Sequence, residues 1–96
     1  MTENIELSAL REEINNLDKE LLEILEERFS VCEEVAGIKK ELEMPIEDKK
    51  RESQIIQSCI NSTSLDKNFV KNLFALVLAE SKLKQEKIYG ESESDT

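Results

Sequence analysis

The chain has 96 residues, of which 39% are hydrophobic and 36% are charged, with two glycines, one proline, three phenylalanines and no tryptophan. This composition is typical of a single helical domain, and a chain this short buries only about 60–65% of its unfolded surface when it folds alone. The formal net charge of −9 disfavours nucleic acid and anionic membranes as partners, because the overall field repels polyanions. An anionic ligand would need a locally basic site.

Residue types that build several common sites are scarce. The chain has no histidine, and its two cysteines, Cys32 and Cys59, are far apart in the sequence, so we expect no metal site, no disulfide framework and no cofactor. Both cysteines lie among apolar residues and are interpreted as small buried side chains. No cationic leader precedes an apolar stretch and no apolar run approaches about 18 residues, so we expect a cytoplasmic protein without a membrane segment.

A long helix is predicted over residues 6–42, which contain no proline. Apolar residues recur there at alternating spacings of three and four, which places them on one seam of a helix about 55 Å long. A compact chain of this size has a radius of gyration of only about 12 Å, so the seam requires a second molecule to cover it. The seam consists of Leu7, Leu10, Ile14, Leu17, Leu21, Ile24, Val31, Val35, Ile38 and Leu42.

Two shorter helices are predicted after the long one. Pro45 ends the first helix, because proline cannot continue it and disfavours helical geometry in the preceding residue. Asp48 then stands where an N-cap is needed, before a helix over residues 49–60. A third helix, capped by Ser64 or Asp66, is predicted to run to about residue 89.

The apolar stripe of the third helix turns polar towards its C-terminal end. Seven residues beyond Phe74 and Leu78 stand Ser81 and Gln85, so the buried face becomes polar and a polar group should lie against it. The stripe itself consists of Phe69, Val70, Leu73, Phe74, Val77 and Leu78.

These elements predict one all-α domain of three helices over residues 1–90. Residues 91–96 are acidic and rich in serine and have no apolar anchor. Such a segment cannot bury enough apolar surface to fold, so we expect a disordered tail there.

One position of the long seam is occupied by a cation. In heptad register Arg28 takes an a position, while Arg11 and Lys39 flank the same seam at e positions. A guanidinium in an apolar seam is costly unless it is paired, so Arg28 requires an internal acid, a polar role in fixing register, or an anionic ligand. Arg28 and Lys39 lie about 16 Å apart along the helix axis, so their side chains can converge on a small anion.

Arg11 cannot join this pair within one chain. It lies about 25 Å from Arg28 and about 42 Å from Lys39 along the helix, which exceeds the reach of a side chain. If two copies pair antiparallel about a point near Leu22, the partner's Arg11 falls midway between Arg28 and Lys39. We therefore predict an antiparallel homodimer with two sites, in which each copy covers the other's long helix and donates Arg11.

The polar residues around these cations predict a pocket for a small dicarboxylate. Arginine holds carboxylates in bidentate fashion, and Ser81 and Gln85 can fix the ligand's orientation. Glu52 could accept a hydroxyl proton, and the helix N-terminus at Asp48 presents backbone N–H groups. No nucleophile with an adjacent base and no phosphate loop is evident. A reaction in this pocket would rely on conformational restraint and electrostatic stabilisation.

Five short motifs occur in order along the chain. They are L-R-x-x-I-x-x-L-D at residues 10–18, then an L-L-E-E-R-type spacing that leads to Arg28, V-A-x-x-K at 35–39, P-I-x-D-x-x-R-E at 45–52 and S-x-x-x-Q at 81–85. With them the chain resembles the all-helical class of chorismate mutase. The resemblance implies an intertwined homodimer of three-helix chains that rearranges chorismate to prephenate, on the way to phenylalanine and tyrosine. Some proteins fuse this domain to a dehydratase or dehydrogenase, which we do not expect in a chain of this length.

The resemblance also implies roles for the cations. Arg28 and the partner's Arg11 would bind the two carboxylates of the substrate. Lys39 would bind a carboxylate and the ether oxygen. Gln85 would donate to the same ether oxygen, where negative charge develops as the C–O bond breaks.

Further roles follow from the resemblance for the other polar residues. Ser81 would assist the ring carboxylate, while Glu52 and the backbone at Asp48 would hold the ring hydroxyl. The resemblance implies an apolar residue after Ser81, whereas this chain has Lys82. Other motif matches are Val35 and Ile55, which would form apolar walls, and Arg51.

Two other functions fit the same pattern. Isochorismate-pyruvate lyase shares this scaffold and also acts on a dicarboxylate, so product analysis is needed to separate it from the mutase. In a helical dimerisation module without catalysis, Arg28 would serve only to fix register. Replacing Arg28 with leucine in such a module would preserve or raise stability.

Overall fold

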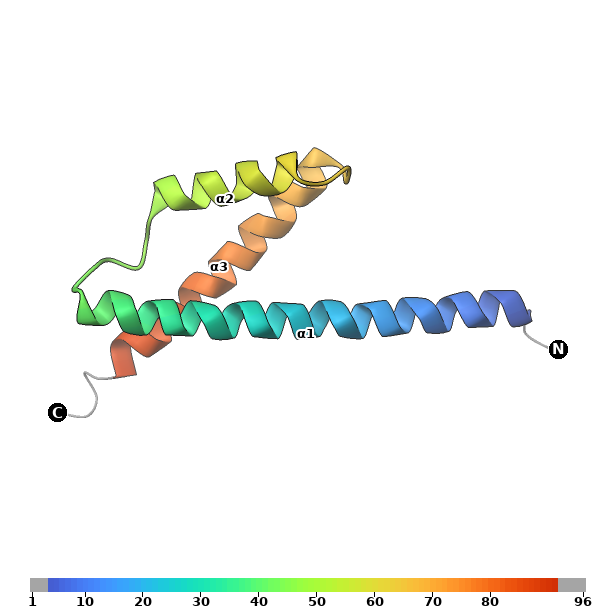
Figure 1. Ribbon diagram of the computed structural model, residues 1–96, viewed down its shortest axis with the longest axis horizontal. Coiled ribbons are helices and arrows are strands. Elements are labelled where there is room, and N and C mark those ends of the chain that lie inside the picture. Colours follow the sequence, from blue (N-terminus) through green and yellow to red (C-terminus); the bar gives the residue numbers. More distant parts are fainter. Residues whose placement is uncertain (1–3, 92–96) are drawn as a thin grey trace.

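The computed structural model describes residues 4–91, which form three α-helices (Figure 1). These are α1 at Ile5–Glu41, α2 at Lys49–Asn61 and α3 at Lys67–Glu91. The described residues contain no strand, which confirms the all-α prediction with one very long first helix. None of these helices combines the length and the apolar character needed to cross a membrane. The predicted tail lies outside the described residues, except for Glu91 at the end of α3.

Each helix begins just after a side chain that caps it. The side-chain oxygens of Asn4, Asp48 and Asp66 each accept the backbone N–H of the residue three positions further on, at 2.9 Å. These acceptors satisfy N–H groups that have no partner inside the helix. The predicted Asp48 cap is confirmed, and Asp66 rather than Ser64 caps the third helix.

The loop after α1 is tied to the far end of α3. Glu43 adopts a left-handed conformation with φ of 55°, and the Met44 N–H donates to the Lys39 carbonyl at 2.8 Å, so the chain turns sharply out of the helix. The Tyr89 hydroxyl donates to the Met44 carbonyl at 2.7 Å, and Lys40 Nζ donates to the Ile88 carbonyl at 3.3 Å. These bonds fix where α2 begins relative to α1 and α3.

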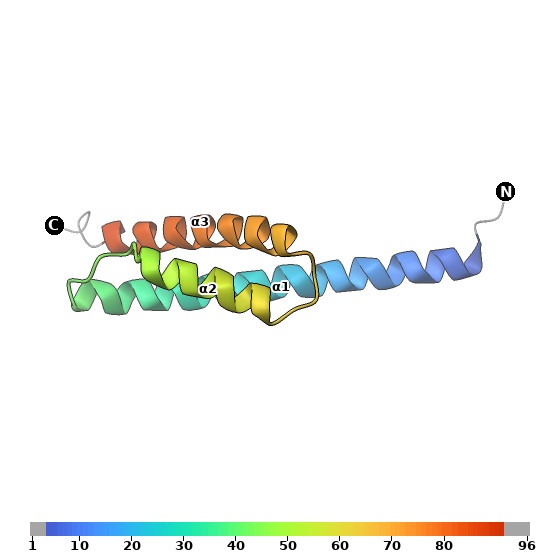
Figure 2. The same cartoon turned by 90° about the horizontal axis from the view of Figure 1, so that it is seen from above.

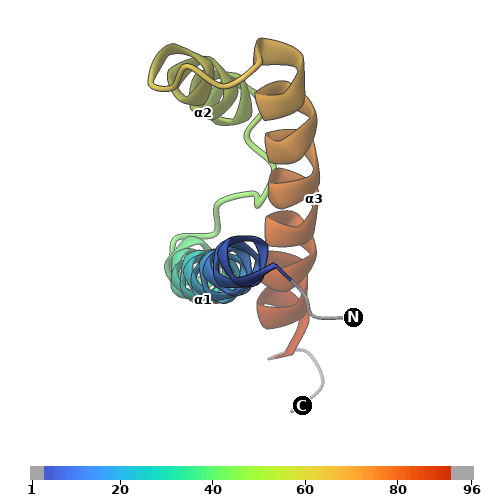
Figure 3. The ribbon, with the colours of Figure 1, turned by 90° about the vertical axis from the view of Figure 1, so that its right-hand side faces the viewer.

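The third helix holds the other two apart. α3 packs against both α1 and α2, whereas within residues 4–91 no Cα atom of α1 lies within 8 Å of a Cα atom of α2. Figure 3 shows α3 bridging the two separated helices, and Figure 1 shows it crossing the C-terminal part of α1 at an angle. The buried apolar residues are few and small, and lie where α3 meets its neighbours. They are Ala36, Val70, Val77 and Leu78.

Much of the long seam is left uncovered by the chain itself. The N-terminal half of α1 extends beyond α2 and α3 (Figures 1 and 2), and the radius of gyration is 18.3 Å, well above the value of about 12 Å for a compact chain. Leu10, Ile14 and Leu17 are 55–57% exposed. A single chain therefore cannot cover its own first helix, as its length indicates.

A second apolar face runs along the outside of α3. Phe69, Leu76 and Leu83 recur every seven residues and are 54%, 72% and 60% exposed. The prediction that Phe69 belongs to the buried stripe is wrong for the single chain. Val70 next to it takes the buried position at 2% exposure, and neighbouring helical residues point about 100° apart.

Candidate active site

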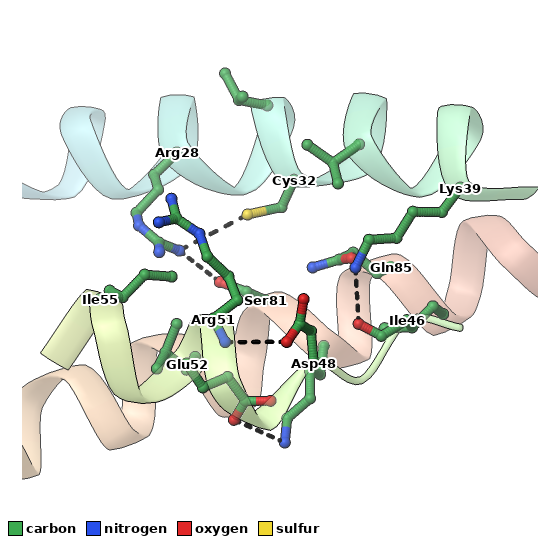
Figure 4. Close-up of a pocket in the computed structure, with 14 residues that line it drawn as sticks. Arg28, Cys32, Lys39, Ile46, Asp48, Arg51, Glu52, Ile55, Ser81 and Gln85 are labelled. Atoms are coloured by element: carbon green, nitrogen blue, oxygen red, sulfur yellow. Dashed lines mark hydrogen bonds and ion pairs between the residues drawn. The ribbon is translucent and has the colours of Figure 1, made fainter. Parts of the chain in front are cut away.

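A pocket of about 400 Å³ lies where α1, α2 and α3 face one another (Figure 4). Its volume is within the range of about 300–1,000 Å³ that ligand pockets occupy. The pocket exists because α3 separates α1 from α2 without filling the space between them. It is lined by Arg28, Val31, Cys32, Val35, Lys39, Ile46, Asp48, Arg51, Glu52, Ile55, Leu78, Ser81, Lys82 and Gln85.

The structure brings most of the predicted site residues to this pocket. Arg11 is the exception: it does not line the pocket, and it stands 17 residues before Arg28 on the same helix, which is about 25 Å. Val35 and Ile55 line the pocket as well. The predicted residues that line it are Arg28, Lys39, Asp48, Glu52, Ser81 and Gln85.

The pocket has a charge opposite to that of the chain. Its lining includes four cations and two carboxylates, so its formal net charge is +2, against −9 for the whole chain. Arg28 and Lys39 of α1 stand on one side, and Arg51 extends from α2 towards Arg28 (Figure 4). A small dianion can therefore bind here against the repulsive field of the rest of the surface.

Arg28 is held in the pocket by a hydroxyl rather than by an acid. Its Nη1 donates to Ser81 Oγ at 2.7 Å and lies 3.7 Å from Cys32 Sγ. The Ser81 hydroxyl in turn donates to the Val77 carbonyl at 2.7 Å, and Ser81 is 3% exposed. Within residues 4–91 no carboxylate forms an ion pair with Arg28. The positive charge is thus oriented but not neutralised, which favours an anionic ligand over an internal acid.

Lys39 and Gln85 stand together at the other end of the pocket (Figure 4). Lys39 Nζ donates to the Ile46 carbonyl at 2.9 Å, which leaves two further ammonium protons for a ligand. Gln85 is 9% exposed, and its Oε1 is buried without a hydrogen-bond partner. A buried amide with unused hydrogen-bonding capacity is costly in a folded chain unless a ligand engages it. Lys39 Nζ and the Gln85 amide nitrogen are the donors at this end of the pocket, whereas Gln85 Oε1 is an unpartnered acceptor.

The second helix contributes two carboxylates. Asp48 Oδ1 caps α2 through the Arg51 N–H, so one of its oxygens is already used. Glu52 Oε1 lies 3.3 Å from Lys82 Nζ, while Glu52 Oε2 is buried without a partner. Glu52 therefore offers one acceptor oxygen to a ligand.

Sequence reasoning missed parts of the pocket lining. Cys32 was interpreted as a buried small residue, but it is half-buried and lies beside Arg28. Lys82 was noted only as a departure from the family pattern, and its pairing with Glu52 gave no signal because thirty residues separate the two. Arg51 was named only as a motif match without a role, and its place beside Glu52 in the first turn of α2 brings it to the pocket. In the part of the chain that the structure describes, no three His, Cys, Asp or Glu side chains gather as metal ligands would.

Comparison with known proteins bears on the same residues. The sequence pattern of the family described as chorismate mutase type II matches residues 10–86, a range that includes every lining residue of the pocket. This chain belongs to the chorismate mutase type II family. The match also includes Arg11, which lies away from the pocket in the single chain.

Individual relatives cover this chain almost entirely. The bifunctional chorismate mutase/prephenate dehydratase of Enterobacter agglomerans is 37% identical over 83 residues, which are 83% of this chain and 21% of that protein. The protein of the same name from Escherichia coli K12 is 35% identical over 89 residues, 90% of this chain and 23% of that protein. The chorismate mutase of Methanocaldococcus jannaschii is 29% identical over 91 residues, 92% of each chain. The chain thus spans less than a quarter of the length of these two bifunctional relatives and nearly all of the third.

Proposed function

We propose that this chain rearranges chorismate to prephenate, in the biosynthesis of phenylalanine and tyrosine. The observation that carries the proposal is the pocket, which holds an oriented, un-neutralised Arg28 at one end and the donors Lys39 and Gln85 at the other. Membership of the chorismate mutase type II family supports it. Such a pocket suits a dicarboxylate that carries an ether oxygen between its charged groups.

Arg28 would bind one carboxylate of the substrate. Its guanidinium can form two parallel hydrogen bonds to a carboxylate, and the bond to Ser81 holds it in place for this purpose. The Ser81 hydroxyl already donates to Val77, so Ser81 would act on the carboxylate through Arg28 rather than by donating to it directly.

Lys39 and Gln85 would stabilise the transition state. As the C–O bond of chorismate breaks and the new C–C bond forms, negative charge develops on the ether oxygen. Preoriented donors aimed at such an oxygen stabilise the transition state more than the ground state. The rearrangement moves no proton, so positioned donors and a compact substrate conformation are sufficient chemistry.

The ring hydroxyl of the substrate would lie against α2. Glu52 Oε2 is a buried acceptor without a donor among the described residues 4–91, and a hydroxyl is the donor that chorismate would bring. The backbone at Asp48 would contact the same hydroxyl. These contacts fix the substrate's orientation without taking part in bond breaking.

The functional unit would be an intertwined antiparallel homodimer. Two apolar faces support this: the α1 seam, where Leu21 and Ile24 are 54% and 61% exposed, and the outer face of α3. Burying both against a second copy gives the hydrophobic stabilisation that one chain lacks. With a symmetry axis near Leu22, the partner's Arg11 would complete the pocket between Arg28 and Lys39. Residues 1–90 as the catalytic domain and a cytoplasmic location remain predictions.

Product identification tests the proposal. The purified chain is incubated separately with chorismate and with isochorismate, and the products are identified by mass spectrometry. Prephenate from chorismate is the expected result. Pyruvate from isochorismate without prephenate from chorismate would replace the mutase with a lyase, and no product from either would favour the dimerisation module.

Bound ligand should shield Cys32 from alkylation. Cys32 lines the pocket 3.7 Å from Arg28, whereas Cys59 on α2 is not part of the lining. With prephenate at about ten times its Kd, roughly nine tenths of the pockets are occupied, so iodoacetamide should label Cys32 about tenfold more slowly. Cys59, the internal control, should be labelled at an unchanged rate by peptide mass spectrometry. Unaltered labelling of Cys32 at saturation would place the ligand elsewhere.

A further inference from the structure

Lys82 of α3 pairs with one of the pocket's carboxylates. Its Nζ lies 3.3 Å from Glu52 Oε1, the pair drawn as a dashed line at Glu52 in Figure 4, and 4.0 Å from Glu47 Oε1. The Lys82 and Glu52 side chains are only 33% and 26% exposed, and both residues line the pocket. An ion pair that is mostly withdrawn from water is screened far less than a surface pair.

The two oxygens of Glu52 have different environments. Oε1 faces Lys82, whereas Oε2 is buried and has no hydrogen-bond partner. A carboxylate oxygen in this condition is stabilised only when a donor arrives. Because Glu52 lines the pocket, a ligand hydroxyl can supply that donor.

A carboxylate beside a dianionic ligand raises an electrostatic difficulty. Two like charges a few ångströms apart in a half-buried site repel strongly. A cation paired with one Glu52 oxygen offsets the charge of the carboxylate and leaves the other oxygen, Oε2, without a partner. Lys82 is placed to do this, since it approaches Oε1 and also contacts Glu47.

We propose that Lys82 is a positioning residue, which fixes the Glu52 carboxylate and offsets its charge so that Glu52 can accept the substrate's hydroxyl. The proposal rests on the proposed function for the identity of the substrate. It assigns Lys82 no contact with the reacting atoms. Its whole effect on catalysis passes through Glu52.

Replacement of Lys82 by methionine tests this role against a matched control. Lys82→Met should lower kcat/KM for chorismate by about tenfold or more, the usual scale for losing one charged hydrogen-bonded contact. Lys82→Arg, which keeps the positive charge, should recover most of that loss. Lys84→Met is the control, because Lys84 lies on the same helix and pairs with Glu80 at 3.7 Å but does not line the pocket. It should keep wild-type turnover.

A double-mutant cycle shows whether the effect passes through Glu52. In a Glu52→Gln background the carboxylate that Lys82 serves is absent, so adding Lys82→Met should change kcat/KM by less than about twofold. A full tenfold loss in that background would mean that Lys82 acts on the substrate directly. That result, or an unchanged kcat/KM in Lys82→Met alone, would overturn the proposal.

Urea unfolding tests the pair without relying on turnover. At one fixed protein concentration, Lys82→Met should lower the unfolding midpoint more than Lys84→Met does, because it leaves Glu52 half-buried without its counter-charge. Adding Glu52→Gln to Lys82→Met should restore part of the loss. Equal midpoints for the two lysine variants would overturn the proposal. A wild-type chain that makes no prephenate would contradict the proposed function, and the unfolding comparison would still decide the pairing.

Discussion

Replacing Gln85 with leucine should lower kcat for the rearrangement of chorismate by about 10²- to 10³-fold, the effect of removing one preoriented donor to a developing oxyanion. KM should change far less, because the ether oxygen carries little charge in the ground state. Leucine is preferred to alanine because Gln85 is 9% exposed, so a similar volume avoids a cavity in the wall. Steady-state kinetics with chorismate measure both parameters.

The control for this variant is the same substitution outside the pocket. Gln57 lies on α2, where its amide donates to Asn61 at 3.3 Å, and it is exposed. Gln57→Leu should leave kcat and KM at their wild-type values. A Gln85→Leu chain that folds normally and keeps full kcat would remove the amide from the mechanism.

The helices were predictable to within a few residues because their signals are local. The Asp48 cap, the proline at position 45 and the apolar spacing of the first helix each act within one or two turns of chain. The polar end of the third helix was equally visible, since Gln85 continues the register of Leu78, which is buried, and Ser81 that of Phe74, which is half-buried. A break in a hydrophobic pattern therefore located one wall of the pocket before any tertiary contact was known.

Contacts between elements were beyond this kind of reasoning. The bond from Arg28 to Ser81 spans 53 residues and the bond from Lys82 to Glu52 spans 30. Both join residues on different helices, and the periodicity within one helix does not encode which helices meet. The sequence allowed three explanations for Arg28: an internal acid, a polar role in fixing register, or an anionic ligand. The bond from Arg28 to the neutral Ser81 hydroxyl excludes the internal acid.

The uncovered seam and the position of Arg11 both bear on whether two copies of the chain pair. Arg11 lies about 25 Å from Arg28 along a rigid helix, so it can reach a pocket only in another molecule. The seam around it is exposed, with Leu10, Ile14 and Leu17 at 55–57%, and large exposed apolar patches mark interaction sites. An antiparallel pair would use one interface both to bury the seam and to complete two pockets.

Mixing two inactive variants should restore activity if the pockets are shared between chains. Arg11→Ala and Arg28→Ala should each lower kcat/KM by about 10²-fold or more, the loss expected from truncating a charged partner of a buried carboxylate. In a heterodimer, one pocket would carry both substitutions and the other would carry neither. Random exchange makes about half of the dimers heterodimers, so the mixture should regain about a quarter of wild-type activity. Chorismate turnover is measured before and after the two chains are mixed.

The design separates a shared pocket from a pocket built within one chain. Subunit exchange is confirmed independently by native mass spectrometry of chains that differ in isotope label. Mixing Arg28→Ala with Lys39→Ala provides the matched control, because both residues belong to the same chain's side of the pocket, and each heterodimer pocket would then lack one of them. That mixture should stay inactive. Recovery there would show that Arg28 and Lys39 do not belong to one chain's side of the pocket. No recovery from Arg11→Ala with Arg28→Ala after verified exchange would show that Arg11 does not act across the interface.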